Sequence, residues 1–280
     1  ALEWNTESKG SLEDREKGER VSLSNVRAVW WFDFPEPRVS GLDIEPEHIE
    51  WAKYETRNGL RWILTSLDAC YMSHPDAIDA ASLKTVQLQT ARELGLRIPR
   101  TIISNMAGGV RQFVERRRQV VFKTISPLSR ERSRKSRAIL TTLVDASAID
   151  DRALGVKLNM FQEFVSKVFD VRTTVVGDTT FSARIESQAS EQTSVDWRRY
   201  DIANTPHFPH ELPFDVSRRC IALTKRLNLR YGAIDFAVTS EGEYFFLEIN
   251  PVGLWLWLEG LTGQPISHAI ARELIAMSQA

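Results

Sequence analysis

The spacing of hydrophobic positions along the chain predicts a mixture of helices and strands. Short runs rich in Val, Ile, Phe and Thr are typical of strands, whereas apolar residues three and four positions apart indicate one face of a helix. After the first hundred residues, strands are expected at 101–104, 119–125, 159–165, 168–176, 179–187, 233–239 and 244–250. The fold class predicted from this pattern is α/β (α+β), and strands dominate from residue 159 onward.

Helices are expected between these strands. Residues 47–67 form one long helix or a pair of helices, and residues 82–94 form a clearer one, with Ser82 as its N-cap and Gly95 as its stop. A further helix is expected after Asp215, which caps it, and others at 110–117 and 264–277. No internal repeat interrupts this order of elements.

The first strong apolar segment is residues 26–34, which predict a buried strand that Pro35 and Pro37 end. A buried strand needs neighbours on both sides, yet ten of the first twenty residues are charged and offer only weak candidates. Two interpretations remain open. Either an upstream strand–helix unit is absent, or the terminus, which starts with Ala rather than Met, is trimmed or processed.

Composition excludes several classes of protein. The 280 residues are 42% hydrophobic and 26% charged, which excludes wholesale disorder and a collagen-like structure. The 36 basic and 37 acidic residues give a net charge of −1, so bulk nucleic-acid binding is not expected. Two cysteines favour a reducing, cytoplasmic setting, and no apolar run approaches the roughly 18 residues of a membrane span.

The most informative segment is a predicted hairpin at residues 233–250, with Gly242 in its turn. On its second strand Glu248 and Asn250 are two positions apart, so both side chains leave the same face, which Asp235 on the first strand also reaches. Two carboxylates and an amide oxygen are hard ligands that suit Mg²⁺ when substrate phosphates complete its shell. A polar outer face of the hairpin is the alternative.

The neighbours of these polar residues favour the metal site. Bulky apolar side chains surround Glu248 in the second strand, namely Phe245, Phe246, Leu247 and Ile249. A strand of this composition suggests a covered sheet, where unpaired carboxylates are costly.

The segment Glu248-Ile-Asn250-Pro-Val-Gly begins thirteen residues after Asp235. This arrangement resembles the magnesium hairpin of the ATP-grasp ligases. Other landmarks of that family follow in order: Lys84 opening a helix, the strand lysine Lys123 in the segment Val120-Val-Phe-Lys123, the adenine hinge Phe161-Gln162-Glu163-Phe164-Val165, and the pair Asp170 and Arg172. The resemblance implies that Lys84 and Lys123 contact phosphates, that the hinge binds adenine, and that Asp170 holds the ribose.

Two segments resemble the microviridin, or graspetide, branch of peptide maturases: Asp196-Trp-Arg-Arg-Tyr-Asp201 and residues 250–259. RimK-type glutamate ligases share the ATP site but differ at these places. The resemblance implies an ATP-grasp fold in which two α/β subdomains, 81–158 and 159–280, grip ATP. A pre-ATP-grasp domain, residues 1–80, precedes them and is expected to be incomplete.

The same resemblance implies a chemistry. ATP, with two Mg²⁺, would phosphorylate a carboxylate of a precursor peptide that has a leader segment, and a hydroxyl or amine would then displace phosphate from the acyl phosphate. The implied catalytic residues are Arg184, Asp196, Arg198 and Arg199. Asp196 would accept a proton from the attacking group, and the polar stretch 190–199 is expected to be unburied.

The residues themselves support some of these roles. An ammonium at Lys123 is costly among bulky neighbours unless it faces an anion such as phosphate, although a snorkelling lysine is the alternative. Lys84 could be a solvated lysine of a first helical turn, and Asp170 and Arg172 could form a surface salt bridge. The basic stretch 126–137 could close on ATP or on an acidic peptide, or remain a solvated loop.

Two other functions remain open at this stage. One is a ligase that acts on glutamate or another small molecule at the same ATP site. The other is a non-catalytic peptide-binding module, against which the intact set of Asp235, Glu248 and Asn250 argues. A homodimer is a further prediction, and neither a nucleic-acid nor a membrane partner is expected.

Overall fold

The computed structural model describes residues 2–7, 10–14, 16–32, 37, 43–125, 140–145, 147, 149–199 and 201–279. The chain divides into two compact units, Ala1–Asp76 with Ile270–Ala280, and Ala77–Ala269. All of the site residues predicted from the sequence belong to the second unit. Among the described helices, none has both the length and the apolar character that a membrane span requires.

The first unit contains short elements and one long helix. Strands β1 (Leu2–Glu3), β2 (Ser11–Asp14) and β3 (Glu19–Ser22) form an antiparallel sheet, and β4 (Ala28–Val29) pairs in parallel with β5 (Cys70–Tyr71). Helix α1 (Ile49–Thr65) follows a short 3-10 turn at Pro46–His48 and confirms the helix expected there. The long buried strand expected at residues 26–34 is wrong, because among the described residues of that range only the two half-buried residues of β4 pair.

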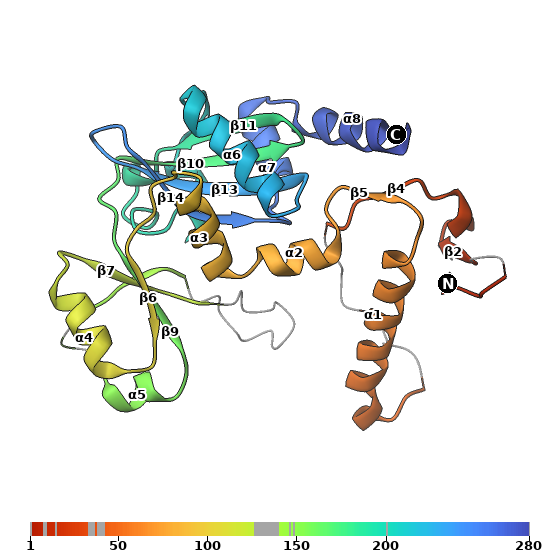
Figure 1. Cartoon of the computed structure of the whole chain (residues 1–280), viewed down its shortest axis with the longest axis horizontal. Helices are drawn as coiled ribbons and strands as arrows, with labels where there is room; N and C mark the ends of the chain where they lie inside the picture. Colours follow the sequence, from red (N-terminus) through yellow and green to blue (C-terminus); the bar gives the residue numbers. More distant parts are fainter. Residues whose placement is uncertain are drawn as a thin grey trace. The chain divides into compact units, whose positions relative to one another are not determined.

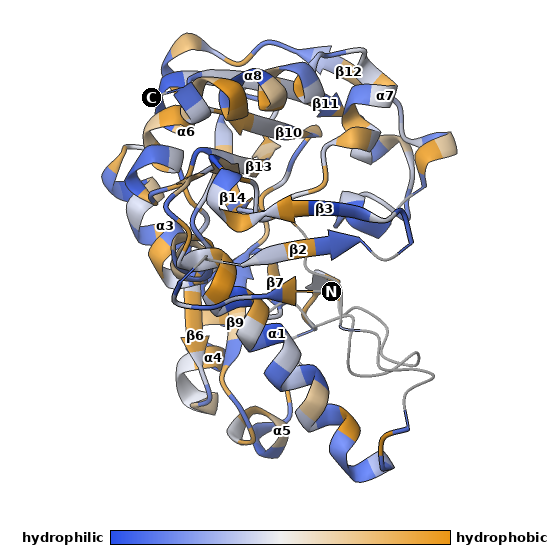
Figure 2. Ribbon diagram, turned by 90° about the vertical axis from the view of Figure 1, so that its right-hand side faces the viewer, coloured by the Kyte–Doolittle hydropathy of each residue, from blue (hydrophilic) through white to orange (hydrophobic). Residues whose placement is uncertain are grey.

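The smaller sheet of the second unit has four antiparallel strands in the order β6-β9-β7-β8. They are β6 (Thr101–Ser104), β7 (Val120–Lys123), β8 (Thr142–Leu143) and β9 (Asn159–Glu163). Helices α4 (Ala107–Glu115) and α5 (Asp151–Gly155) pack against this sheet (Figure 1), and their buried Phe113 and Leu154 share a core with Val120 and Phe161. Apolar residues accordingly recur along β6 and β9 (Figure 2).

The larger sheet has five antiparallel strands in the order β12-β11-β10-β13-β14. They are β10 (Phe169–Val176), β11 (Thr179–Ile185), β12 (His207–His210), β13 (Tyr231–Val238) and β14 (Tyr244–Asn250). Helix α6 (Phe214–Arg226) crosses β10, β11 and β13, while α3 (Lys84–Glu93) packs along β14 (Figure 1). The fully buried Cys220 and Leu223 of α6 confirm its predicted apolar face.

Two predicted helix caps are wrong. The Ser82 hydroxyl donates to the Ile78 carbonyl and so closes α2 (Pro75–Ala81), while α3 begins after Leu83 without a side-chain cap. Helix α6 begins after Pro213, which places Asp215 inside its first turn, where a carboxylate still favours the helix dipole. Sequence patterns also missed α2, α5, α7 (Leu256–Thr262) and β12, whereas the last helix, α8 (Ile266–Gln279), was expected.

The hairpin of β13 and β14 confirms the turn predicted at Gly242. Gly242 has a φ of 75° in its turn, and its N–H donates to the Thr239 carbonyl at 3.0 Å. Asp235 lies directly opposite Glu248, and the register shifts between Asp235 and Phe236. Such a bulge re-aims side chains and frequently adjoins a functional site.

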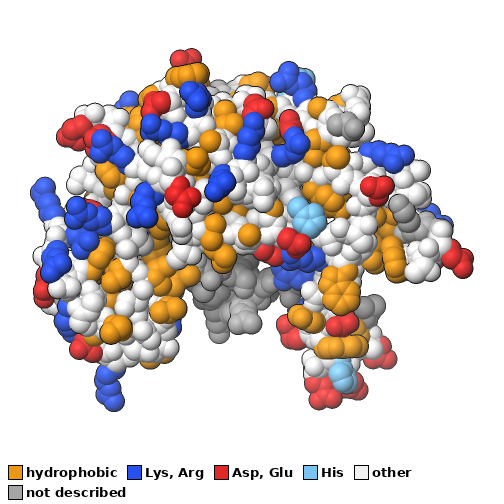
Figure 3. All heavy atoms as spheres, in the orientation of Figure 1, with side chains coloured by type: hydrophobic (Ala, Val, Ile, Leu, Met, Phe, Trp, Pro, Cys, Tyr) orange, Lys and Arg blue, Asp and Glu red, His pale blue; other side chains and the backbone are white. Residues whose placement is uncertain are grey.

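Charged side chains of both signs are interspersed on the face shown in Figure 3. No single-sign patch covers the described part of that face, in keeping with the balanced composition.

Candidate functional site

The cleft between the two sheets of the second unit contains most of the residues predicted from the sequence. Its walls come from β7 and β9 on one side and from β10, β13 and β14 on the other. The cleft has two adjoining halves, which are continuous because they share five lining residues: Lys123, Thr141, Arg198, Leu247 and Glu248.

Glu248 is surrounded by cations. Lys84 of α3 donates to one of its carboxylate oxygens and Arg198 to the other. Burial alone would raise the pKa of Glu248, but Arg198, Lys84 and Lys123 hold that pKa far below its usual range. Glu248 is therefore an anion at every physiological pH.

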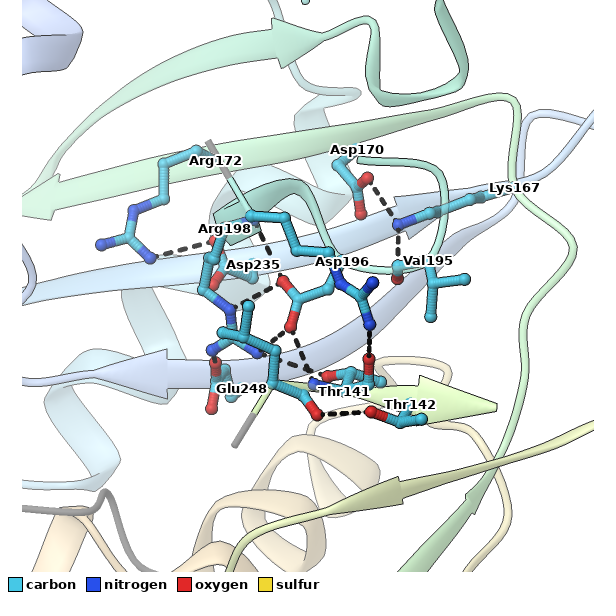
Figure 4. Close-up of polar contacts among 12 residues, drawn as sticks. Thr141, Thr142, Lys167, Asp170, Arg172, Val195, Asp196, Arg198, Asp235 and Glu248 are labelled. Atoms are coloured by element: carbon cyan, nitrogen blue, oxygen red, sulfur yellow. Dashed lines mark hydrogen bonds and ion pairs between the residues drawn. The ribbon is translucent and has the colours of Figure 1, made fainter. Parts of the chain in front are cut away.

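Asp235, opposite Glu248 in the sheet, pairs with Arg172 of β10, whose guanidinium donates to it at 3.0 Å (Figure 4). Both side chains are buried. Burial raises the pKa of Asp235, and Arg172 opposes that rise. Gly253 makes the arrangement possible, because a Cβ at that position would lie 2.5 Å from the Arg172 guanidinium.

Asp196 and Arg198 form a two-pronged ion pair (Figure 4). The Arg198 Nε and Nη2 each donate to a different Asp196 oxygen at 2.9 Å, and the Thr141 N–H donates to Asp196 at 3.1 Å. Burial alone would raise the pKa of Asp196, yet these hydrogen bonds lower it to about 2. The carboxylate thus fixes Arg198, which in turn reaches Glu248.

The expectation that residues 190–199 are unburied is wrong for three of them. Thr193, Asp196 and Trp197 are buried, because the polar groups of the stretch pair with one another and with Thr141. Arg199 also joins this network, since its guanidinium donates to the Thr141 carbonyl at 3.1 Å.

Lys123 lies at the end of β7 and lines both halves of the cleft. Desolvation lowers the pKa of Lys123 to about 8, although Glu248 raises it in part. Among the described residues, none accepts a hydrogen bond from its ammonium group. An anionic ligand would supply the missing acceptor.

Asp170 and Lys167 form a second buried ion pair, with 2.6 Å between Nζ and the carboxylate. Burial raises the pKa of Asp170, and Lys167 opposes the rise. Lys167 also donates to the Val195 carbonyl at 3.3 Å. Sequence reasoning missed both Lys167 and Thr141, since neither lies in a motif or shares a period with a predicted site residue.

The hinge residues enclose the other end of the cleft. The N–H groups of Glu163 and Phe164 donate to the carbonyls of Arg100 and Gln119, and the Gln162 amide donates to Thr101. No carbonyl in the described part of the chain accepts from the Val165 N–H. That donor faces no competition from the protein.

Two predicted residues and one predicted segment stand apart from this cluster. Asn250 is exposed at the mouth of the cleft, where its side-chain oxygen accepts from the Val252 N–H at 3.0 Å. Arg184 is not brought to the cleft: it lies opposite Val171, on the face of the sheet away from Asp170 and Arg172, and stacks on Phe169 at 4.0 Å. The basic stretch 126–137 lies outside the described residues.

The donor set determines what metal chemistry is available. Within the described residues, no three His, Cys, Asp or Glu side chains are gathered closely enough to hold a metal ion. Asp235, Glu248 and Asn250 supply hard oxygen atoms, so they suit a cation such as Mg²⁺ only if a ligand adds further oxygens.

Comparison with solved structures gives the family. A RiPP-associated ATP-grasp ligase from Chryseobacterium gregarium, in complex with ADP and a leader and core peptide, is 28% identical, with 98% of this chain and 84% of that one covered and a TM-score of 0.89. The macrocyclase MdnC from Microcystis aeruginosa MRC, bound with precursor peptide MdnA, is 30% identical, with 99% and 86% covered and a TM-score of 0.84. The chain belongs to the RiPP-associated ATP-grasp ligases.

The fold alone extends further. The ATP-grasp ligase PsnB, in complex with a minimal precursor, Mg and ADP, is 19% identical, with a TM-score of 0.74 over all of this chain and 85% of that one. No family model and no curated protein sequence matches the chain. The ATP-grasp fold and the ligase class predicted from the sequence are confirmed by the structural likeness.

Proposed function

We propose that this ATP-grasp ligase uses ATP and Mg²⁺ to activate a carboxylate side chain of a ribosomally made precursor peptide and joins it to a hydroxyl or amine of the same peptide. The observation that carries the proposal is the pair Asp235 and Glu248, which face each other on one hairpin among four cations, Lys84, Lys123, Arg172 and Arg198. The peptide complexes of the relatives from C. gregarium and M. aeruginosa support it.

In this proposal the nucleotide lies along the cleft. The Val165 N–H and the carbonyl groups of the hinge would bind adenine, with Gln162, Glu163 and Phe164 around it. The Lys167–Asp170 pair would face the ribose, because it lines the same half of the cleft. Lys84 and Lys123 would bind the phosphates, since no described residue accepts a hydrogen bond from the Lys123 ammonium group.

Magnesium fits the other half of the cleft. Asp235, Glu248 and Asn250 would hold the ion together with phosphate oxygens, and it would offset the negative charge of the transferring phosphoryl group. Asp235 pairs with Arg172, and Glu248 pairs with Arg198 and Lys84. Cations of the protein therefore already neutralise both carboxylates.

The reaction has two steps. The peptide carboxylate attacks the γ-phosphorus of ATP, which forms a C–O–P bond and releases ADP; the hydroxyl or amine of a second side chain then attacks the acyl carbon, loses its proton and expels phosphate. Arg198 and Arg172 would stabilise the anionic oxygens, with Arg199 holding the Thr141 backbone beside them.

Asp196 does not suit the proton-accepting role expected from the sequence. Both of its oxygens are engaged by Arg198 and Thr141, and its pKa of about 2 makes it a weak base. We propose that it is a positioning residue that aims the Arg198 guanidinium at Glu248.

Further parts of the proposal depend on the sequence. We propose that residues 81–158 and 159–280 are the two ATP-grasp subdomains and that residues 1–80 form the preceding domain. Two cysteines without a disulfide, the exposed Cys70 and the buried Cys220, are compatible with the cytoplasm as the place of action. A homodimer stays a prediction.

A glutamate-adding or small-molecule ligase is the second candidate, because the ATP half of the cleft would serve either substrate. Two observations favour the peptide maturase. The segment Asp196–Arg199 places arginines beside the carboxylates. The relatives bound to peptides share the fold over nearly the whole chain.

The experiment incubates the purified chain with ATP, Mg²⁺ and a candidate precursor peptide, to be sought as a short reading frame beside its gene, and follows the peptide mass. Each ring formed removes one water, and one ADP appears for each ring. Arg198→Ala should abolish ring formation, whereas Arg184→Ala, the same change on the opposite face of the sheet, should retain it. ADP release with no loss of water, or equal activity of the two variants, would contradict the proposal.

A further inference from the structure

A separate hollow lies on the other side of Trp197 from the nucleotide half of the cleft. Its apolar lining is Trp197, Ile202, Leu254 and Trp257, and its polar lining is Asp201, Thr205 and His207. Asp201 is the one carboxylate in this described lining, and it already accepts hydrogen bonds from Ser190 at 2.6 Å and Asn204 at 2.9 Å. The hollow therefore offers hydrocarbon and aromatic surface rather than an unpaired charge.

Aromatic rings give the hollow a fixed wall. The ring centroids of Trp197 and Trp257 are 5.4 Å apart, and the His207 ring meets Trp257 edge-on at 5.5 Å. The Trp257 indole donates to the Leu254 carbonyl at 3.2 Å, which holds the ring in place. Because burial lowers the pKa of His207, its ring is neutral at pH 7 and adds no charge to the wall.

The mouth of the hollow leaves apolar side chains in water. Ile202 is 53% exposed and Leu254 is 51% exposed, although Trp197 and Thr205 of the same lining are buried. Covering them with an apolar group would remove hydrocarbon surface from water, which is favourable in proportion to the area covered.

The hollow adjoins the proposed catalytic cleft at Trp197. Trp197 lines both, and it lies between Asp196 and Arg198 in the chain. On the opposite wall, Leu254 follows the proposed metal residue Asn250 by four positions. A chain segment that places one side chain beside Glu248 has only to pass Trp197 for a neighbouring side chain to reach the hollow, since consecutive residues advance about 3.3–3.6 Å.

We propose that this hollow is a side-chain subsite for the peptide substrate. It takes one apolar residue, aromatic or leucine-sized, close in sequence to the residue whose carboxylate reacts. The proposal rests on the proposed function, and it adds what the peptide must carry besides its reacting groups. Charged residues are disfavoured there, because entry would strip their water and Asp201, the one carboxylate of the described lining, is already engaged by Ser190 and Asn204.

The test is a pair of matched variants. Leu254→Glu puts a carboxylate into the hollow, whereas Leu256→Glu makes the same change two residues later, at a leucine that is 67% exposed and does not line it. With the candidate precursor peptide, Leu254→Glu should raise the KM for peptide by about tenfold or more, with ADP affinity unchanged, and Leu256→Glu should leave both unchanged. Equal peptide KM values for the two variants would overturn the subsite.

A charge swap identifies the occupant. Each apolar residue of the peptide is replaced in turn by lysine and tried with both enzymes. At one position of the peptide, lysine should abolish ring formation by the wild-type enzyme. The Leu254→Glu enzyme should form the ring in that same lysine-substituted peptide. If no position behaves in this way, or if Leu254→Glu instead dissociates an oligomer during sedimentation, the side-chain subsite is refuted.

A second measurement separates the subsite from the proposed function. N-acetyl-L-tryptophanamide and N-acetyl-L-leucinamide are titrated against protein labelled at its indole nitrogens, with N-acetyl-L-glutamine amide as the polar control. The apolar probes should shift the Trp257 indole signal in the wild type and in Leu256→Glu, but not in Leu254→Glu. Such binding without any peptide ligation would uphold the subsite while the proposed function fails, and absence of the shift would overturn the subsite alone.

Discussion

Arg198 and Glu248 form an ion pair between residues 50 positions apart, and the same guanidinium also holds Asp196. One arginine therefore links the loop of residues 187–205 to the hairpin that carries the proposed metal ligands. The carboxylate expected to bind Mg²⁺ has cationic partners within the protein, Arg198 and Lys84.

The first prediction concerns Glu248→Gln. The neutral amide removes a metal oxygen with its charge, so ligation should fall on the order of 100-fold or more. It also leaves Lys84, Lys123 and Arg198 close together without their shared anion, so the free energy of unfolding should fall by about 1–3 kcal/mol. Ring formation by mass spectrometry and urea unfolding measure the two effects.

A double variant separates these effects. Adding Lys84→Met to Glu248→Gln removes one of the stranded cations, so part of the lost stability should return while the enzyme stays inactive. Near-wild-type turnover by either variant would remove Glu248 from the metal site.

The second prediction concerns Lys123 and pH. Its pKa of about 8 lies below the ordinary value, because burial disfavours the charged form. A bound phosphate would raise that pKa again, so ADP binding should take up a proton between about pH 8 and 10, and ADP affinity should fall as pH rises through 8.

Calorimetry of ADP binding without metal, at pH 8.5 in buffers of different ionisation enthalpy, measures this proton. Lys123→Arg is the control, since a guanidinium stays protonated throughout this range and should show no uptake. Equal uptake by the wild type and Lys123→Arg would assign the proton to another group.

The third prediction concerns stability in acid. The pKa of Asp196, about 2, lies below that of an ordinary aspartate, so its ion pair stabilises the fold above about pH 4 and this contribution is lost as pH falls towards 2. Asp196→Asn should cost about 2 kcal/mol at pH 7, and the difference from wild type should shrink on acidification. Urea unfolding at pH 7, 4 and 3 gives the difference; a constant gap would contradict the assignment.

The fourth prediction concerns close packing at Gly253. A Cβ there would lie 2.4 Å from the Cβ of Ala233 and 2.5 Å from the Arg172 guanidinium, so Gly253→Ala should destabilise by about 1–3 kcal/mol and weaken the Arg172–Asp235 pair. Gly260→Ala is the control, since nothing lies within 4 Å of its Cβ and alanine favours the helix. Thermal unfolding should show changes of opposite sign.

The sequence predicted the parts of this site that are local. The hairpin, the face shared by Asp235 and Glu248, and the strand that ends at Lys123 follow from period-two alternation and one glycine turn. Networks between distant segments were not predictable in this way. The buried carboxylate of Asp196 accepts a hydrogen bond from the N–H of Thr141, 55 residues away. No pattern within either segment encodes that contact.

Arg184 also shows that sequence patterns do not encode contacts between segments. Its residue type and its place in a strand suited a phosphate-binding role, but the register of β10 and β11 sets it opposite Val171 rather than Arg172. A one-residue difference in register decides which face of a sheet a side chain occupies. Strand pairing, which the sequence left open, therefore decided its environment.

Gln87 of α3 has a consequence for the edge of the larger sheet. Its buried amide donates to the Ile249 carbonyl at 2.8 Å and accepts from the Ile249 N–H at 3.2 Å, so a side chain pairs with β14 as another strand would. An exposed strand edge is a template for pairing with other chains. By occupying the free backbone groups beside Glu248, Gln87 closes that template, and it should protect the enzyme from edge-to-edge self-association.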